Sequence, residues 1–576
     1  MRITRRLLSS VIQKRPFYVS TPIFYVNAAP HIGHVYTAVV ADAVQRYEQI
    51  SRSDTQIIFS TGTDEHGIKI QQAAAASNQS LPEYCSRISD EYKTLFRDMN
   101  VDFTDYVRTT EDRHKKAVQH FWNNLLSRDY IYKSQYSGWY SVNDETFVPE
   151  THVKEEIKDG EKVPKHRLIF NSTYDSTSPD TYIKVSLESG HRVEWTEEEN
   201  YMFRLSAFKQ HLQDWLSIDG VITPNKFQKQ LQDLLENEVY FPDISVSRPA
   251  SRVHWAIPVP SDPDQSIYVW LDALVNYLTV IGYPNEDAMR RQRAWPADVQ
   301  VVGKDILKFH GIYWPAFLMA SGFHPPRRIL CHSHWTVDGT KMSKSKHNVV
   351  SPRFTPGGLE ALRYFLLREA TMHSDANYSE TKLIRTINAE LADTLGNLCS
   401  RCTGTALNPR SEYPPLYRPE LLALRGVEAT ELLCDALERL PDICRDHYEN
   451  YHFYKVTHSV IKVLHLANLF FETHKPWELK KDIGRQRELD TILHITMETL
   501  RVTSIILQPI IPNLSEKLLN KLQIPLSRRS WKNAEEISWT MKGAIHETKN
   551  IESGKFVLFQ RIYVDKDNLE KRKVTV

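Results

Sequence analysis

Residues 17–47 read FYVSTPIFYVNAAPHIGHVYTAVVADAVQRY, and this stretch decides the fold. The apolar run at its start predicts a short buried strand, and the apolar residues that recur at helical spacing from Val35 to Tyr47 predict a helix. His31 and His34 then lie at the N-terminus of that helix, where unpaired backbone N–H groups and the positive end of the helix dipole attract phosphate. Gly33 lets a nucleotide approach the backbone closely. The stretch therefore predicts a strand–turn–helix unit with a phosphate site.

A second stretch predicts a mobile cationic loop, and it reads Lys341-Met342-Ser343-Lys344-Ser345. It follows Asp338-Gly339, a dipeptide with a strong preference for hairpin turns, so its two lysines are expected on an exposed loop. Lysines on such a loop can close over a polyphosphate. Each stretch alone also fits an ordinary surface segment, but the two together, in this order, favour an ATP site.

Three other segments are predicted to be strands that end in polar clusters. They are residues 57–59 leading into 61–67, 299–302 leading into 303–305, and 328–331 leading into 332–335. Because strands alternate with helical patterns, we expect an α/β fold with a doubly wound, parallel, Rossmann-like sheet. In such sheets ligands bind beyond the carboxyl ends of the strands, where all these polar clusters fall.

Long helical patterns replace the strands from about residue 386 onward. They cover residues 391–402, 453–471 and 489–507, and they predict an all-helical domain. Between the two halves of the predicted sheet, residues 129–250 are aromatic and charged, with a loop-like patch at 171–180. The chain has 576 residues, 41% of them apolar, which is enough for several packed domains.

The net charge of +1 neither favours nor excludes a nucleic-acid partner. No apolar run reaches the ~20 residues that a membrane span requires, so no membrane association is predicted.

The first twenty residues carry five basic side chains and no Asp or Glu, which is typical of a mitochondrial transit peptide. A flexible basic arm that touches RNA is the alternative.

The two motifs resemble those of the class I aminoacyl-tRNA synthetases, and further segments resemble the methionyl-tRNA synthetases in particular. These segments are Thr21–Asn27, Thr61–Gly67, Gly138–Ser141, Trp270–Ala273, Gly303–Asp305 and His334–Gly339. The resemblance implies a methionine–tRNA ligase that forms methionyl-adenylate from methionine and ATP with Mg²⁺, and then transfers methionine to the terminal adenosine of tRNA(Met). With the basic N-terminus, it implies an enzyme of the mitochondrial matrix.

The resemblance also implies roles for individual residues. His31 and His34 would bind the ATP phosphates, and Lys341 and Lys344 would stabilise the charge that develops during the reaction. The expected ATP-binding residues are His31, Gly33, His34, Lys341, Met342, Ser343, Lys344 and Ser345. The expected methionine-binding residues are Ile23, Tyr25, Asp64, Trp270, Ala273, Leu274, Tyr277 and His310.

The methionine set can be weighed against a simpler interpretation. Trp270, Ala273, Leu274 and Tyr277 share one helix face, and such a stripe is most often part of a hydrophobic core. An aromatic cage nevertheless suits a thioether, since contacts between sulfur and aromatic rings are favourable. By resemblance, Asp64 would hold the α-ammonium group.

For the tRNA, the resemblance places Asn397, Arg401 and Trp477 against the CAU anticodon. Asn397 and Arg401 lie four residues apart on one helix face, and Trp477 follows Pro476 at a predicted helix start. Stacking on an aromatic ring and hydrogen bonds to base edges are common in the recognition of RNA loops. Without the resemblance, a solvated polar pair and a core tryptophan would be favoured.

The expected domains follow from these assignments. They are a transit peptide (1–16), the first catalytic half (17–128), a connective insertion (129–250), the second catalytic half (251–325), a linking region with the lysine loop (326–385) and the anticodon-binding domain (386–576). No further module is recognisable, which favours a monomer. The rivals are a class I synthetase for leucine, isoleucine or valine, and an RNA-binding protein without catalysis.

No zinc site is expected. The six cysteines include one CxxC pair, Cys399 and Cys402, whereas a structural zinc site usually needs two pairs or added histidines. The pair lies in a helical pattern and is expected to be buried as small hydrophobic residues. Some methionyl-tRNA synthetases carry zinc knuckles in their insertion, but residues 129–250 contain no cysteine.

Overall fold

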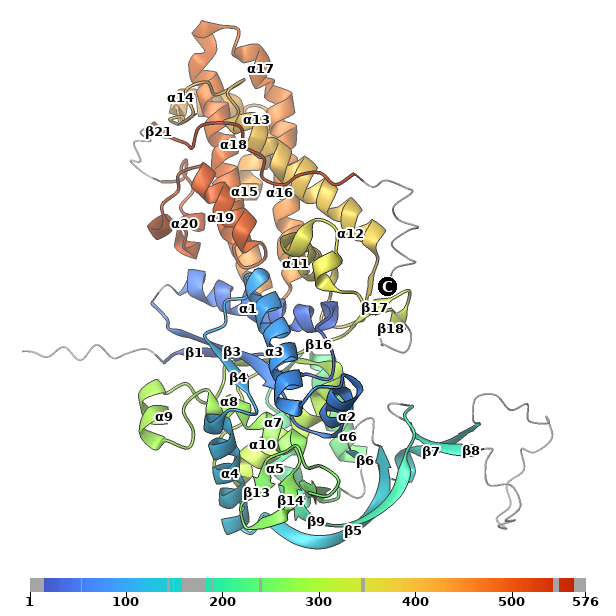
Figure 1. Ribbon diagram of the computed structural model, residues 1–576. Helices are drawn as coiled ribbons and strands as arrows, with labels where there is room; N and C mark the ends of the chain where they lie inside the picture. Colours follow the sequence, from blue (N-terminus) through green and yellow to red (C-terminus); the bar gives the residue numbers. More distant parts are fainter. Residues whose placement is uncertain are drawn as a thin grey trace, which may run out of the picture.

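The computed structural model describes residues 15–52, 54–141, 146–148, 150–157, 182–187, 190–237, 241–342, 348–541 and 548–563. A parallel sheet lies at its centre (Figure 1). Its strands, in spatial order, are β10 (Ile222–Thr223), β16 (Ile329–His332), β15 (Val299–Gly303), β1 (Phe17–Ser20), β3 (Ile57–Asp64) and β2 (Phe24–Tyr25), with β4 (Asp105–Arg108) also paired to β3. The doubly wound parallel sheet predicted from the sequence is thereby confirmed.

The order of the strands places a switch point at the middle of the sheet. From β1 the chain runs through α1 (Ile32–Ser51) to β3 on one side, whereas β15 leads to β16 on the other. β1 and β15 are neighbours, with Val19 opposite Val299. Loops that leave neighbouring strands in opposite directions open a crevice at their carboxyl ends, and ligands bind there.

Helices cover both faces of the sheet. Val19 packs into one core with α1, and the next residue along the strand, Tyr18, packs into a second core. Because successive strand residues point to opposite faces, strands covered on both sides are apolar throughout. The helices of this part are α1, α2 (Ile68–Ala76), α3 (Leu81–Asp98), α4 (Asp112–Ser127), α5 (Lys209–Leu216), α6 (Asn225–Asn237), α7 (Val269–Leu274), α8 (Asn276–Thr279), α9 (Glu286–Gln292) and α10 (Trp314–Ala320).

The insertion forms antiparallel strands at one end of the molecule (Figure 1). Its strands are β5 (Ile131–Ser141), β6 (Thr146–Val148), β7 (Val153–Ile157), β8 (Tyr182–Ser186), β9 (Glu194–Phe203), β11 (Ile244–Ser245) and β12 (Ser247–Pro249). β12 pairs with β14 (Asp262–Ile267), and β14 also pairs with β13 (Pro258–Val259). β10 also lies within 129–250, but it belongs to the main sheet, because it pairs in parallel with β16. The loop-like patch at 171–180 lies outside the described residues.

A three-stranded sheet carries the start of the lysine loop. It consists of β18 (Thr340–Lys341), β17 (Trp335–Val337) and β19 (Ala376–Tyr378), in that order. The turn between β17 and β18 is Asp338-Gly339, with φ angles of 49° and 71°. Both angles lie in the left-handed region that two-residue hairpins require, which confirms the predicted turn.

The C-terminal part is a helical bundle, joined to the sheet through α11 (Gly358–Glu369) and a shared hydrophobic core. Its elements are α12 (Glu380–Ile387), the π-helix η7 (Asn388–Gly396), α13 (Asn397–Thr403), α14 (Arg418–Arg425), α15 (Glu428–Glu449), α16 (Phe453–His474), α17 (Pro476–Leu479), α18 (Gln486–Leu507), α19 (Pro512–Lys521) and α20 (Trp531–Glu535). The helices predicted around 391–402, 453–471 and 489–507 are all present.

One small strand pair in this domain is absent from the sequence prediction. β20 (Glu412–Tyr413) and β21 (Lys549–Asn550) pair in antiparallel fashion. Two residues are too few to show any periodicity in a sequence.

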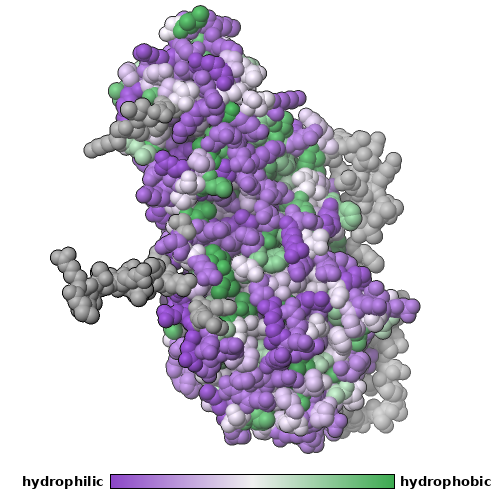
Figure 2. All heavy atoms as spheres, turned by 60° about the vertical axis from the view of Figure 1, so that its left-hand side comes forward, coloured by the Kyte–Doolittle hydropathy of each residue, from purple (hydrophilic) through white to green (hydrophobic). Residues whose placement is uncertain are grey.

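The space-filling view shows a mostly hydrophilic face with small hydrophobic groups scattered over it (Figure 2). Among the described residues, no helix is both long and apolar enough to cross a bilayer.

Candidate active site

A cavity of about 390 Å³ opens at the carboxyl edge of the main sheet. It is lined by the segment between β1 and α1, by the end of β3, by α7 and α8, and by the residues that follow β15 and β16. The predicted site residues that line it are Ile23, Tyr25, His31, Gly33, His34, Asp64, Trp270, Ala273, Leu274, Tyr277, His310 and Met342. The tertiary structure therefore brings the predicted methionine residues and four of the ATP residues around one space.

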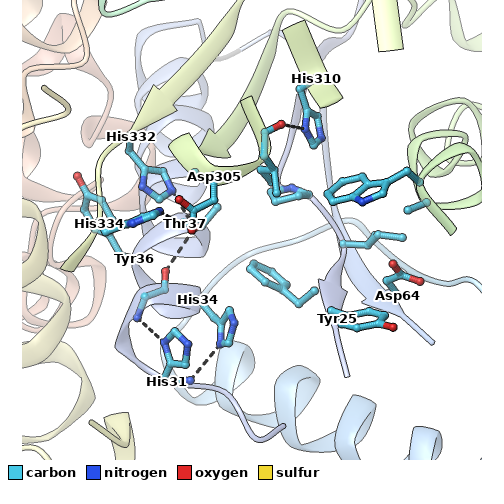
Figure 3. A pocket seen from close by; sticks show the side chains of 18 of the residues that line it. Tyr25, His31, His34, Tyr36, Thr37, Asp64, Asp305, His310, His332 and His334 are labelled. Carbon is cyan, nitrogen blue, oxygen red and sulfur yellow. Dashed lines mark hydrogen bonds and ion pairs between the residues drawn. The ribbon is translucent and has the colours of Figure 1, made fainter. Parts of the chain in front are cut away.

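Figure 3 shows that the cavity has two chemically different ends. His31, His34, Thr37, His332 and His334 gather at one end with Asp305, which provides many hydrogen-bonding groups. Tyr25 and Asp64 lie at the other end, where the remaining lining is mostly aromatic and aliphatic. These two ends, one polar and one apolar with a single carboxylate, suit a ligand that likewise has a polar part and an apolar part.

His31 and His34 form a stacked pair at the start of α1. Their ring centroids lie 3.8 Å apart, and His31 caps the helix by accepting a hydrogen bond from the Gly33 N–H on Nδ1 at 3.0 Å. His34 Nδ1 in turn accepts from the His31 N–H at 3.2 Å. Burial and the neighbouring His31 hold the pKa of His34 well below its ordinary value. His34 is thus neutral, and its proton sits on Nε2, which makes that atom a donor.

A side chain at Gly33 would displace the His31 ring. A Cβ on Gly33 would lie 2.9 Å from Cε1 of His31, closer than carbon atoms approach. The same position is 3.7 Å from Cε of Met342, so the start of the lysine loop lies beside the start of α1. The two motifs that are far apart in the sequence are therefore neighbours in space.

Lys341 belongs to β18, at the entrance to the loop. Ser343, Lys344 and Ser345 lie outside the described residues, and their predicted roles stay predictions.

Sequence reasoning gave His332 and Thr37 no role, yet both line the polar end. The Thr37 hydroxyl and His332 Nε2 are 2.9 Å apart, and His332 Nδ1 donates to the Ser333 carbonyl at 2.9 Å. Burial lowers the pKa of His332 to about 4. Since Nδ1 carries the proton, Nε2 must accept from Thr37. The position of His332 at the end of β16 was the available signal.

The apolar end is built from stacked rings. Trp270 lies against Phe309, with ring centroids 3.6 Å apart and an interplanar angle of 9°. Tyr277 donates its hydroxyl to His310 Nε2 at 2.8 Å, and His310 Nδ1 donates to the Ile306 carbonyl at 2.9 Å. Burial lowers the pKa of His310 to about 4, so this histidine is neutral. These contacts fix the rings relative to one another.

Two buried networks support the Asp64 end. Glu65 is fully buried and accepts from Arg108 Nε at 2.7 Å and from the Thr110 hydroxyl at 2.6 Å. Asp272 on α7 lies 2.6 Å from His66 Nδ1 and 2.8 Å from His114 Nε2.

Asp272 stays ionised despite its burial. Burial opposes ionisation, but the charge and hydrogen bonds of the two histidines hold the pKa of Asp272 below its ordinary value. These bonds fix α7, and hence Trp270, relative to β3.

The predicted anticodon residues gather at a different place. Asn397 and Arg401 share α13, and Trp477 lies on α17, near the end of the bundle that is remote from the sheet (Figure 1). The Arg401 guanidinium lies 5.4 Å from the centroid of the Trp477 ring and 2.7 Å from the Glu472 carboxylate. The Trp477 side chain is 36% exposed, so the alternative of a core tryptophan is wrong.

Cys399 and Cys402 are buried, as predicted for this pair. All six cysteines of the chain are buried thiols. Burial raises the pKa of Cys399 to about 12 and that of Cys402 well above its ordinary value. Within the described part of the chain, no cluster of three or more Cys, His, Asp or Glu side chains has metal-binding geometry.

Comparison with known proteins agrees with both parts of the structure. Residues 17–403 match the family described as tRNA synthetases class I (M), and residues 433–563 match the anticodon-binding domain of tRNA ligases. The chain is 44% identical to the mitochondrial methionine–tRNA ligase of Takifugu rubripes, over 97% of this chain and 92% of that protein. It is 46% identical to the human mitochondrial enzyme, over 89% of this chain and 85% of that protein.

A solved structure supports the same relation. The methionyl-tRNA synthetase of Mycobacterium tuberculosis in complex with methionyl-adenylate superposes with a TM-score of 0.83 at 33% identity, over 95% of this chain and all of that chain.

Proposed function

The chain belongs to the methionyl-tRNA synthetases of class I, with mitochondrial relatives along nearly its whole length, and from this premise we propose how its residues perform the ligase reaction. The observation that carries the proposal is that one cavity has both a histidine-rich end and an aromatic end that contains Asp64. ATP occupies the first end and methionine the second, so that the methionine carboxylate meets the α-phosphorus where the two ends join.

The first step needs no nucleophile from the protein. An oxygen of the methionine carboxylate attacks the α-phosphorus of ATP, and pyrophosphate leaves with Mg²⁺. Catalysis then consists of positioning the reactants and stabilising negative charge. His34 donates from Nε2 to a phosphate, the backbone at Gly33 lies close to the nucleotide, and Lys341 and Lys344 stabilise the charge that develops on the leaving group.

The methionine end selects by shape and polarity. Trp270, Tyr277 and His310 surround the thioether, and Asp64 accepts hydrogen bonds from the α-ammonium group. Sulfur–aromatic contacts of roughly 0.3–1.5 kcal/mol each favour methionine over branched aliphatic side chains. Because the Tyr277 hydroxyl and His310 are already bonded to each other, they offer a fixed wall and lose little entropy on binding.

We expect ATP–pyrophosphate exchange with methionine and with no other standard amino acid at comparable efficiency. The measurement is exchange of labelled pyrophosphate in the presence of each of the twenty amino acids in turn. Comparable turnover with leucine or isoleucine would contradict the assignment of the pocket, and no exchange with any amino acid would favour an RNA-binding protein without catalysis.

The remaining assignments concern the organisation of the protein. We propose that 17–128 and 251–325 form the catalytic domain, that 129–250 is the insertion, and that 326–385 links them to the anticodon-binding domain 386–576. Within 129–250, α5, β10 and α6 pack with the catalytic sheet, since β10 lies beside β16 and the two helices share its hydrophobic core. We also propose a monomer that works in the mitochondrial matrix, with residues 1–16 as its transit peptide.

We expect purified protein to contain no stoichiometric zinc. Zinc prefers thiolates, whereas the Cys399 and Cys402 thiols are buried and have raised pKa values. Elemental analysis of the metal-depleted and the untreated protein checks this. One zinc ion per chain, retained together with activity after mild chelation, would contradict it.

A further inference from the structure

A groove on the helical bundle lies apart from the active-site cavity. It has a volume of about 680 Å³ and is lined by Arg368 of α11, by Glu390 of η7 and by one side of α16. The polar side chains of α16 in this lining include His458, Lys462 and His465. The groove is therefore a polar surface feature of the part of the protein that follows the catalytic sheet.

His458, Lys462 and His465 form one exposed stripe along α16. They are four and three residues apart, so they lie on the same face of the helix at successive turns. All three are exposed, and within the described part of the chain none of their side chains makes a hydrogen bond or an ion pair. This set, the α16 stripe, thus offers N–H donors to a ligand from outside the chain.

The acidic groups beside the stripe are already paired. Glu390 accepts a hydrogen bond from Arg368 Nη2 at 2.9 Å. Glu369 lies 3.1 Å from Arg368 Nη1 and 2.5 Å from Lys382 Nζ. Lys462 has no such partner among the described residues, so it gives the groove a positive charge that is available to an anion.

The stripe leads to the proposed anticodon residues. α16 runs along the bundle from the side of α11 to α17 (Figure 1). In its last turn Glu472 lies 2.7 Å from Arg401, whose guanidinium is 5.4 Å from the centroid of the Trp477 ring. From His458 to Glu472 the helix is about 21 Å long, at 1.5 Å per residue. This length is enough to follow several nucleotides of one RNA strand.

From these observations we propose that the α16 stripe binds the phosphate backbone of the tRNA stem that adjoins the anticodon loop. Double-helical RNA offers phosphates and 2′-hydroxyls to a protein rather than its base edges. Lys462 donates to a phosphate as a cation, and His458 and His465 donate from ring N–H groups on either side of it. Such contacts position the RNA without reading its sequence. The inference rests on the proposed ligase function, with Trp477 at the anticodon.

The role predicts a pattern that differs from that of a base contact. Lys462→Gln should weaken tRNA binding by the same factor whatever the anticodon, because a phosphate is present in every sequence. Each lost phosphate contact also releases fewer bound cations, so the slope of log binding constant against log salt concentration should become shallower by about 0.7–0.9. Trp477→Ala should instead alter the preference for CAU and leave that slope near wild type.

The measurement is equilibrium binding of a tRNA(Met) transcript, and of one with a changed anticodon base, to the full chain between about 50 and 200 mM KCl. Lys462→Arg keeps the charge and should bind like the wild type. Lys116→Gln is the matched control, because Lys116 is an exposed helix lysine on α4 that likewise has no ion pair among the described residues. Its salt slope should not change. Methionine-dependent pyrophosphate exchange, which needs no tRNA, checks the catalytic domain of each variant.

A neutral backbone linkage in the RNA locates the contact. A methylphosphonate carries no charge, so when it is placed singly along the anticodon stem it should weaken wild-type binding at a few linkages. At those linkages it should cost almost nothing further in Lys462→Gln.

Three results would overturn the inference while the ligase function stands. They are an unchanged affinity and slope in Lys462→Gln, an equal loss in Lys116→Gln, and a loss in Lys462→Gln that depends on the anticodon. Full additivity of Lys462→Gln with every methylphosphonate would also contradict a contact with the stem. If the wild-type chain bound no tRNA and catalysed no methionine-dependent exchange, the proposed function itself would be wrong.

Discussion

Replacement of Lys344 by alanine is expected to slow methionyl-adenylate formation by about a hundred- to a thousandfold, the loss typical of a removed group that stabilises charge in a transition state. The dissociation constant of ATP should change by much less, since the loop acts mainly on charge that develops as pyrophosphate leaves. Rapid-quench measurements of a single turnover separate the two quantities. Saturating methionine and ATP remove any contribution from binding.

Lys346 provides a matched control for this prediction. It lies two residues further along the sequence and outside the KMSKS motif, so Lys346→Ala removes an equal charge from the same stretch of sequence. We expect its rate to stay within a few-fold of wild type. If the two alanine variants lose the same amount, the effect is general electrostatic attraction of ATP, and the specific role of Lys344 is wrong. A normal rate with a raised ATP dissociation constant would show that Lys344 only binds.

Replacement of Trp477 by alanine is expected to reduce aminoacylation through weaker recognition of the tRNA. The exposed ring on α17 offers a surface for an unpaired base, with the Arg401 guanidinium 5.4 Å from its centroid. Loss of base stacking costs about 1–3 kcal/mol, which appears as a lower kcat/KM for tRNA. Methionine-dependent pyrophosphate exchange needs no tRNA, and its cavity lies in another domain, so exchange should stay near wild type.

Two further comparisons make this prediction specific. Trp477→Phe keeps an aromatic face and should recover much of the aminoacylation. A changed base in the CAU anticodon should harm the wild-type enzyme more than Trp477→Ala, because the variant has already lost the contact. Equal sensitivity of both enzymes to the anticodon would mean that Trp477 touches no base. An exchange defect as large as the aminoacylation defect would mean that the mutation damages the fold.

The sequence by itself determined the local structures around these residues. The spacing of apolar residues after His34 predicts α1, Asp338-Gly339 predicts the hairpin turn, and Pro476 predicts the start of α17, and all three are present. Each of these signals acts over a few residues, since helix caps, turn dihedrals and periodicity depend on near neighbours. The alternation of strand and helix patterns along the sequence likewise predicts the parallel sheet and the edge that carries the polar clusters.

The tertiary structure alone decided how distant residues combine. Nothing in the sequence pairs Tyr277 with His310, joins Asp272 to His66 and His114, or sets Asn377 against the turn at Gly339. Each of these contacts joins segments separated by long stretches of chain, and each depends on packing that no local pattern encodes.

The protonation states of the site histidines were decided in the same way. The sequence shows that His34 and His310 exist, but only their burial among neighbouring groups lowers their pKa values and keeps them neutral. Removal from water disfavours the charged imidazole, and the hydrogen bond at one nitrogen then fixes which nitrogen carries the proton. The sequence thus specifies the residue types of the site. Their charge, tautomer and orientation depend on how the folded chain packs around them.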